Sequence, residues 1–426
     1  MTRNVLVAMS GGVDSGTSAA LLLNADWNVR GLFMRHAYQA TLSWEETRDV
    51  LTKVPASNEF DLYRVDQNGE LARLSWTAEN FPFCLPRDFA SALDVANFLN
   101  VPLVLLDLSI PFNAIVENFI EEYYAARTPN PCALCNRLIK FGLLWRVAQE
   151  LGATSLATGH YVRKESVGNW SRQFAPGVVD SNEEFSNPPE WLLRDPSENF
   201  FTRSPSPKDQ SYFLYGAPRS VLPYIQFPVG EMEKPKVREL AKRIGLPVAT
   251  KKDSQEICFV PDDERLAFIK RVRDANPERW SALPSDSSGE FLSLDGKKIG
   301  EHHGYEKYTI GQRKGLGMGF GERIFVQRVD PVTHAVTLGP YEALGRSVIR
   351  ATHANWHADV PMNQEFRCQI KIRYRNESCT ATVVANELGE IVVRTDSPRF
   401  AVAPGQALVC YWRDRLLGGG KIEIDD

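Results

Sequence analysis

Six residues near the start of the chain have the types and the spacing of a phosphate-binding loop. The run Ser10-Gly11-Gly12-Val13-Asp14-Ser15 follows the apolar residues 5–7 and precedes a helix-like stretch over residues 17–23. Glycines let the backbone approach a ligand closely, and serine hydroxyls together with the amides of a helix N-terminus point donors at an anion. The Lys-Ser/Thr ending of the Walker loop is missing, so this is not the usual ATPase motif. The alternative is a plain glycine turn before a helix.

A second reactive stretch is the Cys-x-x-Cys pair Cys132 and Cys135, in a loop that two prolines stiffen. The helix predicted after this loop would begin at Cys135. A thiol at a helix N-terminus near Arg and Lys tends to be a thiolate, which is both a nucleophile and a metal ligand. The pair alone fits half of a structural zinc site, a redox pair or core packing. No second such pair follows, so the remaining candidate partner is Cys258.

Composition limits the class of protein that carries these residues. With 426 residues, 43% of them hydrophobic, the chain has room for two or three domains. A net charge of −4 does not indicate a nucleic-acid binder, so any basic face must be local. The sequence has no apolar run long enough for a membrane span and no secretory signal, and seven unevenly spaced cysteines do not make a disulfide framework. We expect a cytoplasmic protein with reduced thiols.

Alternating strands and helices must position the loop. The periodicity predicts an α/β fold with a doubly wound, mostly parallel sheet, in which a nucleotide lies across the carboxyl ends of the strands. Met34 ends the second strand, where an apolar wall under adenine and core packing are equal alternatives. Polar stretches at residues 36–83 and 164–207 read as insertions. The predicted strands are 29–34, 103–108 and 155–157, and the predicted helices are 88–100 and 112–126.

The rest of the chain predicts two smaller domains. A basic helix over residues 264–282 begins a central α+β module that includes the glycine-rich run 311–321, which lacks the strand and the acidic residue of a dinucleotide site. From residue 322 onward, short strands with Gly, Pro and Asn turns predict a small antiparallel β-barrel. The domains are therefore expected at 1–262, 263–321 and 322–426. The predicted late strands are 324–329, 335–338, 365–374, 380–384, 391–394 and 407–412, and Lys371, Arg373 and Arg375 would share one face of the third.

The motifs taken together resemble those of the tRNA-specific 2-thiouridylases, a family of PP-loop N-type ATP pyrophosphatases. The resemblance covers almost the whole chain. Its nine segments are SGGVDS at 10–15, the strand ending at Met34, 128–141, 157–163, 208–214, 254–260, 308–317, 371–375, and Pro404-Gly405-Gln406 with the glycines 418–420.

The resemblance implies a tRNA-uridine 2-sulfurtransferase. ATP would adenylate the C2 oxygen of the wobble uridine, and sulfur would then displace AMP to leave 2-thiouridine, with release of pyrophosphate. Asp14 would help to hold Mg²⁺. The residues implied to bind ATP are Ala8, Met9, Ser10, Gly11, Gly12, Val13, Asp14, Ser15, Met34 and Gly159.

The resemblance also implies a contact surface for the anticodon arm of tRNA. Base contacts would need the uridine to be flipped out, because its ring oxygen is buried in a stacked loop. Lys208 would anchor a phosphate of the RNA. The alternative for His160 is a structural role, as a histidine at a strand end that makes its hydrogen bonds within the protein. The implied tRNA residues are Asn130, Pro131, Cys132, His160, Lys208, Asp209, Gln210, Arg373, Tyr374 and Gln406. The other expected partner is a sulfur-donor or sulfur-relay protein, and the chain is expected to be a monomer.

Two routes for sulfur stay open. In one, Cys258 carries a persulfide and Cys135 attacks it, with a transient disulfide between the two cysteines. In the other, Cys132, Cys135 and Cys258 hold an iron-sulfur cluster that binds the incoming sulfide. The second route arises because Cys132 stands where the best-known members of the family have an aspartate general acid/base, and a thiol is a poorer substitute for a carboxylate than for a metal ligand.

Two other functions compete with sulfur transfer. A PP-loop ligase or amidotransferase acting on a small carboxylate would need neither the cysteines nor a basic barrel. An RNA-binding protein that has lost catalysis would not need an intact loop together with Cys135 and Cys258. The cysteines and the loop therefore favour the sulfurtransferase over both.

Overall fold

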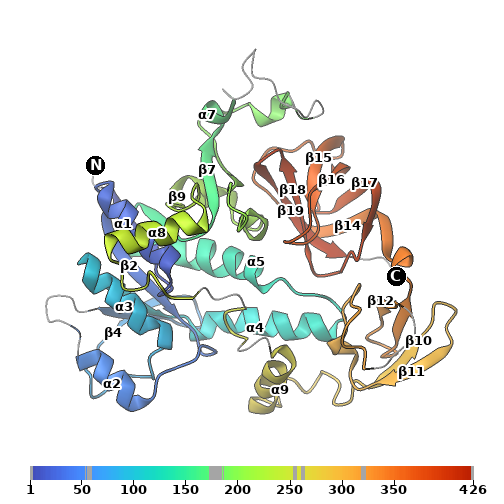
Figure 1. Ribbon diagram of the computed structural model, residues 1–426, viewed down its shortest axis with the longest axis horizontal. Coiled ribbons are helices and arrows are strands. Elements are labelled where there is room, and N and C mark those ends of the chain that lie inside the picture. Colours follow the sequence, from blue (N-terminus) through green and yellow to red (C-terminus); the bar gives the residue numbers. More distant parts are fainter. Residues whose placement is uncertain are drawn as a thin grey trace. The chain divides into compact units, whose positions relative to one another are not determined.

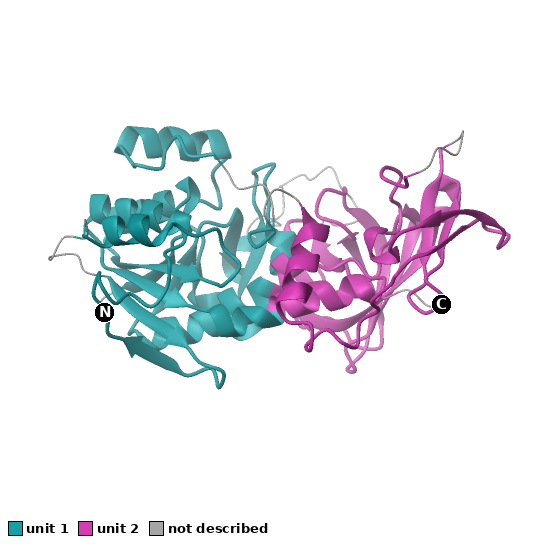
Figure 2. Cartoon of the chain, turned by 90° about the horizontal axis from the view of Figure 1, so that it is seen from below, with its two compact units in different colours: residues 1–114, 135–175, 195–263 teal, residues 115–134, 176–194, 264–426 magenta. Residues whose placement is uncertain are grey.

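The computed structural model describes residues 3–52, 54, 60–171, 185, 187–252, 257–260, 264–317 and 323–423. The chain divides into two compact units, coloured separately in Figure 2. Unit 1 comprises residues 1–114, 135–175 and 195–263, and unit 2 comprises residues 115–134, 176–194 and 264–426. Among the residues described, no helix is both long and apolar enough to cross a membrane.

Unit 1 is built on a seven-stranded sheet in the order β4-β3-β5-β2-β1-β6-β9. All neighbours pair in parallel except the β3–β4 hairpin at one edge. The central strands are apolar and buried because helices cover a parallel sheet on both faces. This confirms the predicted doubly wound fold. The strands are β1 (Asn4–Ala8), β2 (Asn28–Arg35), β3 (Asp61–Val65), β4 (Leu71–Leu74), β5 (Leu103–Asp107), β6 (Ser155–Thr158) and β9 (Ile225–Gln226).

Helices connect these strands, and α8 packs beside α1 (Figure 1). An antiparallel hairpin joins β7 (Val162–Ser166) to β8 (Asn199–Arg203). The helices that lie wholly or partly in unit 1 are α1 (Val13–Asn24), α2 (Trp44–Thr52), α3 (Arg87–Leu99), α4 (Ser109–Tyr124), α5 (Pro131–Cys135), α6 (Leu144–Glu150), α7 (Val167–Ser171) and α8 (Lys234–Ile244).

Both expected insertions contain regular structure. The stretch at 36–83 supplies α2, β3 and β4, and β3 pairs in parallel with β5, so this stretch widens the sheet. The stretch at 164–207 contributes most of the β7–β8 hairpin and α7, while residues 172–184 and 186 lie outside the described part. The first insertion was predicted from its polarity, which also suits an edge hairpin with one solvated face.

The helix that carries the cysteine pair begins earlier than the sequence predicted. Asn130 accepts a hydrogen bond from the Ala133 amide at 3.1 Å through Oδ1, and Pro131 is the first residue of α5. An Asn cap followed by Pro is a strong helix start. Cys135 is therefore the last residue of α5, and the prediction that it begins the helix is wrong.

A π-helix, η2 (Asn136–Leu143), follows Cys135 directly. A Cβ on Gly142 would lie 2.8 Å from the Arg137 carbonyl oxygen, so glycine is needed in its last turn. π-Helical turns cost stability and occur frequently at functional sites. This one marks the segment after Cys135.

Unit 2 contains a small sheet and a closed barrel. The sheet has the order β11-β10-β13-β12, and the antiparallel barrel runs β14-β17-β16-β15-β18-β19 and closes through β14 and β19. The barrel confirms the predicted fold of the C-terminal part. The elements are α9 (Arg265–Ala275), β10 (Gly289–Leu292), β11 (Lys298–His302), β12 (Phe325–Val329), β13 (Val336–Gly339), β14 (Gly345–Trp356), β15 (Glu365–Lys371), β16 (Cys379–Ala385), β17 (Ile391–Phe400), β18 (Ala407–Trp412) and β19 (Arg415–Glu423).

Two details of the predicted barrel are wrong. The strands expected at 324–329 and 335–338 pair with each other and with β10 in the small sheet, so the barrel starts at β14. The strand expected at 365–374 ends at Lys371, because the Asn376 amide bonds to the Arg373 carbonyl oxygen and closes a turn. Arg373 and Arg375 therefore lie in that turn and do not alternate along a strand face with Lys371.

Candidate active site

The loop between β1 and α1 braces itself. The Ser15 hydroxyl donates to the Gly12 carbonyl oxygen at 3.1 Å and accepts a hydrogen bond from the Ser10 amide, also at 3.1 Å. Gly12 is the N-cap of α1, and no side chain caps the helix. Unfilled amides at a helix N-terminus attract anions. Ser15 thus shapes the loop, and the amide end of α1 is the part that suits a phosphate group.

Two glycines let the loop fit between its neighbours. Gly11 has φ +71°, and a Cβ there would lie 2.3 Å from the carbonyl oxygen of Asp88 in α3. A Cβ on Gly159, just after β6, would lie 2.8 Å from the Ser15 amide nitrogen. The sequence predicted that Gly159 lets a nucleotide approach; the close approach in the structure is to the loop itself.

The loop lies at the point where the strand order reverses. β1 pairs with β2 on one side and with β6 on the other, and the next strands are added outward from each. Ligands of open α/β sheets bind outside the carboxyl ends of the strands at such a point. The segments that meet there are the phosphate-type loop after β1 and Gly159 after β6.

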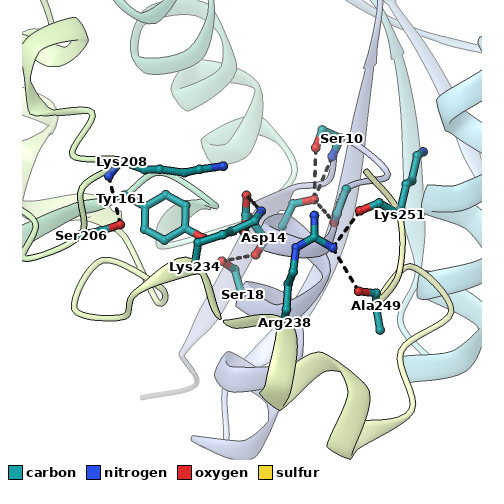
Figure 3. A network of polar contacts seen from close by, with 12 residues as sticks. Ser10, Asp14, Ser18, Tyr161, Ser206, Lys208, Lys234, Arg238, Ala249 and Lys251 are labelled. Atoms are coloured by element: carbon teal, nitrogen blue, oxygen red, sulfur yellow. Dashed lines mark hydrogen bonds and ion pairs between the residues drawn. The ribbon is translucent and has the colours of Figure 1, made fainter. Parts of the chain in front are cut away.

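The Asp14 carboxylate binds side chains from two other segments (Figure 3). Lys234, the first residue of α8, donates to both carboxylate oxygens at 2.7 Å each, and the Tyr161 hydroxyl donates to Oδ1 at 2.7 Å. Lys234 is buried and Asp14 is half-buried. A carboxylate beside an open helix N-terminus also suits a Mg²⁺ ion that is shared with phosphate oxygens. Sequence reasoning missed Lys234, whose only signal is its place just before Pro235 in the first turn of α8.

A second lysine ties the loop to α3. The Lys251 ammonium donates to the Gly11 carbonyl oxygen at 3.0 Å, to the Asp88 carboxylate at 2.7 Å and to the Ser91 hydroxyl at 3.0 Å. Arg238 of α8 donates to the Lys251 carbonyl oxygen at 2.9 Å (Figure 3). Sequence reasoning missed Lys251 and Arg238 because their partners are backbone carbonyls and residues far away in sequence.

The segment 208–210, predicted to contact tRNA, lies next to this network. The Gln210 side chain accepts from the Tyr161 amide and the Gln210 amide donates to the Tyr161 carbonyl oxygen, both at 2.9 Å. Asp209 accepts from the Ser211 hydroxyl at 2.8 Å and so caps its own turn. Lys208 is exposed. Of the three residues, Lys208 has the ammonium that suits a phosphate, while Asp209 and Gln210 hold the turn.

His160 lies between two partners in unit 1. Its Nδ1 is 2.8 Å from the Thr158 hydroxyl and its Nε2 is 3.4 Å from the Lys140 ammonium. Burial and the charge of Lys140 hold the pKa of His160 well below its usual 6.5. The ring is therefore neutral, and the ammonium favours the tautomer with the proton on Nδ1.

Met34 is half-buried at the carboxyl edge of the sheet, beside an ionic cluster. The Asp107 carboxylate binds Arg35 and Arg64, each at 2.8 Å. Burial alone would raise the pKa of Asp107, but hydrogen bonds from Ser109, Arg35 and Arg64 lower it. Arg64 comes from the stretch at 36–83, so this stretch braces the edge. Neither the cluster nor this use of the stretch was predicted.

A buried histidine, His36, directly follows the last residue of β2. The His36 ring stacks on Phe112 with centroids 3.9 Å apart and an interplanar angle of 5°. Burial, together with the charge of Arg35, lowers the pKa of His36 to about 3. His36 is therefore neutral throughout the physiological pH range.

The three cysteines differ in exposure. Cys132 and Cys258 are exposed and Cys135 is half-buried. Among the described residues, no three His, Cys, Asp or Glu side chains are grouped as a metal ion requires. The segment 253–256, just before Cys258, lies outside the described residues.

Three residues predicted to contact tRNA make contacts within unit 2. Gln406 donates to the carbonyl oxygens of Thr128 and Pro129, just before Asn130. Arg373 donates to the Ile310 carbonyl oxygen at 3.1 Å. The ammonium of Lys371 lies 5.9 Å from the ring centroid of Tyr374. Unit 2 thus brings Gln406 to the segment of Asn130, Pro131 and Cys132.

Comparisons with known proteins cover almost the whole chain. Residues 3–67 and 72–262 match the family described as the tRNA methyl transferase HUP domain. Residues 281–340 match the tRNA methyl transferase PRC-barrel domain, and residues 346–422 match the aminomethyltransferase beta-barrel domain.

Full-length relatives share one name. The tRNA-specific 2-thiouridylase MnmA of Syntrophotalea carbinolica is 35% identical over 422 residues, which are 99% of this chain and 98% of that protein. The protein of the same name from Rhodopirellula baltica is 37% identical over 421 residues, which are 98% and 96% of the two chains. Among solved structures, the U34-tRNA thiolase NcsA from Methanococcus maripaludis, with its 4Fe–4S cluster, aligns with 67% of this chain at 14% identity and a TM-score of 0.28.

Proposed function

The chain belongs to the family of tRNA-specific 2-thiouridylases named MnmA, and from this premise we propose that it converts the wobble uridine of tRNA to 2-thiouridine. The observation that carries the proposal is the open amide end of α1 with Asp14 beside it, at the switch point of the sheet. A chain that retains this loop together with Cys135 and Cys258 has the parts for both activation and sulfur transfer.

The first step uses ATP as a substrate. The amides at the start of α1 would bind the phosphates, Met34 would lie against adenine, and Asp14 would hold Mg²⁺. The bound metal would neutralise phosphate charge as the C2 oxygen of uridine attacks the α-phosphate and pyrophosphate leaves. Mg²⁺ and the Lys234 ammonium would compete for the Asp14 carboxylate. Lys234 would therefore turn from Asp14 to the pyrophosphate.

The second step uses thiols. We propose that the Cys135 thiolate attacks the inner sulfur of a Cys258 persulfide, so that a disulfide forms and sulfide leaves. The sulfide adds to C2 of the adenylated uridine, and AMP leaves with the C2 oxygen. A dithiol reductant must then reduce the Cys135–Cys258 disulfide before the next turnover. In the alternative route, Cys132, Cys135 and Cys258 would hold an iron-sulfur cluster that delivers the sulfide.

The remaining roles extend the proposal to partners. Lys208 would bind a phosphate of the anticodon arm, and Arg373 with Tyr374 would contact the same RNA. A sulfur-donor or relay protein would load Cys258. We propose that the protein works as a monomer in the cytoplasm.

The test measures AMP release. Purified protein with ATP, Mg²⁺ and a sulfide source should form AMP only when substrate tRNA is added. AMP formation driven by a small carboxylate without RNA would support the ligase alternative and overturn this proposal.

A separate experiment distinguishes the sulfur routes. Protein purified without oxygen is analysed for iron and by visible spectroscopy, beside Cys132→Ala. Full thiolation without charge-transfer absorption after reconstitution with iron and sulfide supports the persulfide route. Joint loss of iron and activity in Cys132→Ala would overturn it.

A further inference from the structure

The segment that leads to Cys132 is anchored at two places in unit 2. At the first, the buried Glu122 near the end of α4 binds Arg127 at 2.6 Å and Lys421 of β19 at 2.9 Å. Burial of a carboxylate is costly unless it is paired, and here two cations pair it. The chain therefore leaves α4 with its direction fixed by the barrel.

The second anchor is the barrel turn before β18. The Gly405 amide donates to the Ile422 carbonyl oxygen at 2.8 Å, and the Ile422 amide donates to the Gln406 carbonyl oxygen at 2.7 Å, so the turn is part of the β19 ladder. Across from it, the Thr128 amide donates to the Pro404 carbonyl oxygen at 2.7 Å. Gly405 has φ +85°, and a Cβ there would lie 2.8 Å from the Thr128 carbonyl oxygen. Glycine therefore permits two backbones to approach that a side chain would separate.

The Gln406 side chain completes this anchor. Its Nε2 lies 3.1 Å from the Thr128 carbonyl oxygen and 3.2 Å from the Pro129 carbonyl oxygen. Two carbonyl oxygens can be satisfied only by a donor, so the NH₂ group must face the segment. Both of its protons are used there, and they cannot donate to a base at the same time.

The anchored backbone passes directly into α5. Asn130 follows Pro129 and caps the helix, Pro131 is its first residue, and Cys132 is its second. Between Pro129 and Cys132 lie only Asn130, which caps the helix, and Pro131, whose ring restricts φ. A shift of the two carbonyls would move the cysteine helix with them.

We infer that Gln406 is a positioning residue for the Asn130–Cys132 segment, acting through the carbonyls of Thr128 and Pro129. Its consequence for catalysis rests on the proposed function. The barrel then has a second task besides RNA contact, because it holds the substrate-side end of the cysteine helix in place.

The test compares Gln406→Met, which keeps the size and removes the donor, and Gln406→Glu, which faces the two carbonyls with an acceptor. The control is Gln369→Met, the same change on half-buried β15 of the same barrel. Hydrogen–deuterium exchange is measured by mass spectrometry on peptide 127–134 of the full chain without tRNA. We expect exchange of this peptide to be about tenfold faster in both Gln406 variants, as the loss of two neutral hydrogen bonds implies, and unchanged in the control. Unchanged exchange in peptide 407–412 shows that the barrel remains folded.

Kinetics give the second readout. Single-turnover thiolation at saturating tRNA should slow about tenfold in Gln406→Met, while the tRNA Kd changes less than twofold, because misplacement affects the rate more than binding. Unchanged exchange at 127–134 would overturn the inference, and so would a raised Kd with an unchanged rate, which is the result of a direct RNA contact. If the wild type does not thiolate, the proposed function fails while the exchange data still decide whether Gln406 holds the segment.

Discussion

Replacing Asp14 by Asn should separate the ATP site from the tRNA surface. Asn keeps the shape and the acceptor for Tyr161 but removes the charge that Lys234 meets at 2.7 Å on both oxygens. Loss of charge stabilisation of this kind costs roughly 10²–10³-fold in rate. We therefore expect thiolation to fall by about that factor, and the tRNA Kd to stay within about twofold because the proposed RNA contacts lie elsewhere.

The same change should lower stability by an amount that the ion pair sets. The side chain of Lys234 is 10% exposed and that of Asp14 is 29% exposed. Breaking a fully buried pair costs about 3–5 kcal/mol, and the partial exposure of Asp14 reduces this to about 1–3 kcal/mol. For a domain of this size the thermal midpoint should fall by roughly 3–10 °C.

The double variant Asp14→Asn with Lys234→Met is the matched control. It removes both charges, so the thermal midpoint should recover most of the loss, while thiolation stays at least about 10²–10³-fold below that of the wild type. Thermal unfolding, nucleoside analysis and tRNA binding are measured on Asp14→Asn, on the double variant and on the wild type. A double variant that does not recover would refute the stabilising role of the pair, and an equal loss of tRNA affinity in Asp14→Asn would show that the loop is misassigned.

Three further outcomes follow from single contacts. Arg373→Ala should weaken tRNA binding and make the slope of log affinity against log salt shallower by roughly one unit; an unchanged slope would move the RNA footprint off this turn. Lys251→Met should raise the KM for ATP roughly tenfold because Gly11 loses its anchor, whereas exposed Lys252→Met should not; equal effects of the two variants would contradict the anchor. The unfolded chain protonates His36 near pH 6.5 and the folded chain only near about 3, so the neutral ring stabilises the fold above pH 6.5 and this contribution is lost as pH falls toward 3. The loss is up to about 1.4 kcal/mol per pH unit; urea unfolding between pH 4 and 7 should show a shallower loss in His36→Gln, but not in His353→Gln at an exposed position.

Local signals were sufficient for the loop and the sheet. A glycine pair between an apolar run and a helix, followed by strands that are apolar throughout, has few folds other than a doubly wound sheet. The predicted helix at 88–100 and strand at 103–108 agree with α3 and β5 to within one residue.

Long-range partners were the part that sequence could not supply. Lys234 is separated from Asp14 by 220 residues, and nothing in its local pattern distinguishes it from an ordinary surface lysine. Gln406 contacts carbonyl oxygens, which every residue has, so its two bonds leave no trace in the sequence of residues 128 and 129. The start of α5 was predictable from the Asn130 cap and Pro131, but the two prolines were interpreted as stiffening a loop that ends at Cys135.

The barrel strands show a third limit. Alternation identified most of them, yet it could not tell which sheet a strand joins, so β12 and β13 were assigned to the barrel. The strand β19 was missed because its three glycines weaken a strand pattern. In the structure these glycines admit close backbone neighbours, such as the Leu408 carbonyl oxygen, which would lie 2.1 Å from a Cβ on Gly419.

The central claim is that this chain makes 2-thiouridine in tRNA with two thiols. The most direct measurement is mass analysis of tRNA nucleosides after incubation of the purified protein with substrate tRNA, ATP, Mg²⁺ and a sulfur donor that loads persulfide. The wild type and Cys84→Ser, a change at a half-buried cysteine outside the proposed site, should form 2-thiouridine, and Cys135→Ala and Cys258→Ala should not. Absence of 2-thiouridine with the wild type, or its full formation by both cysteine variants, would contradict the account.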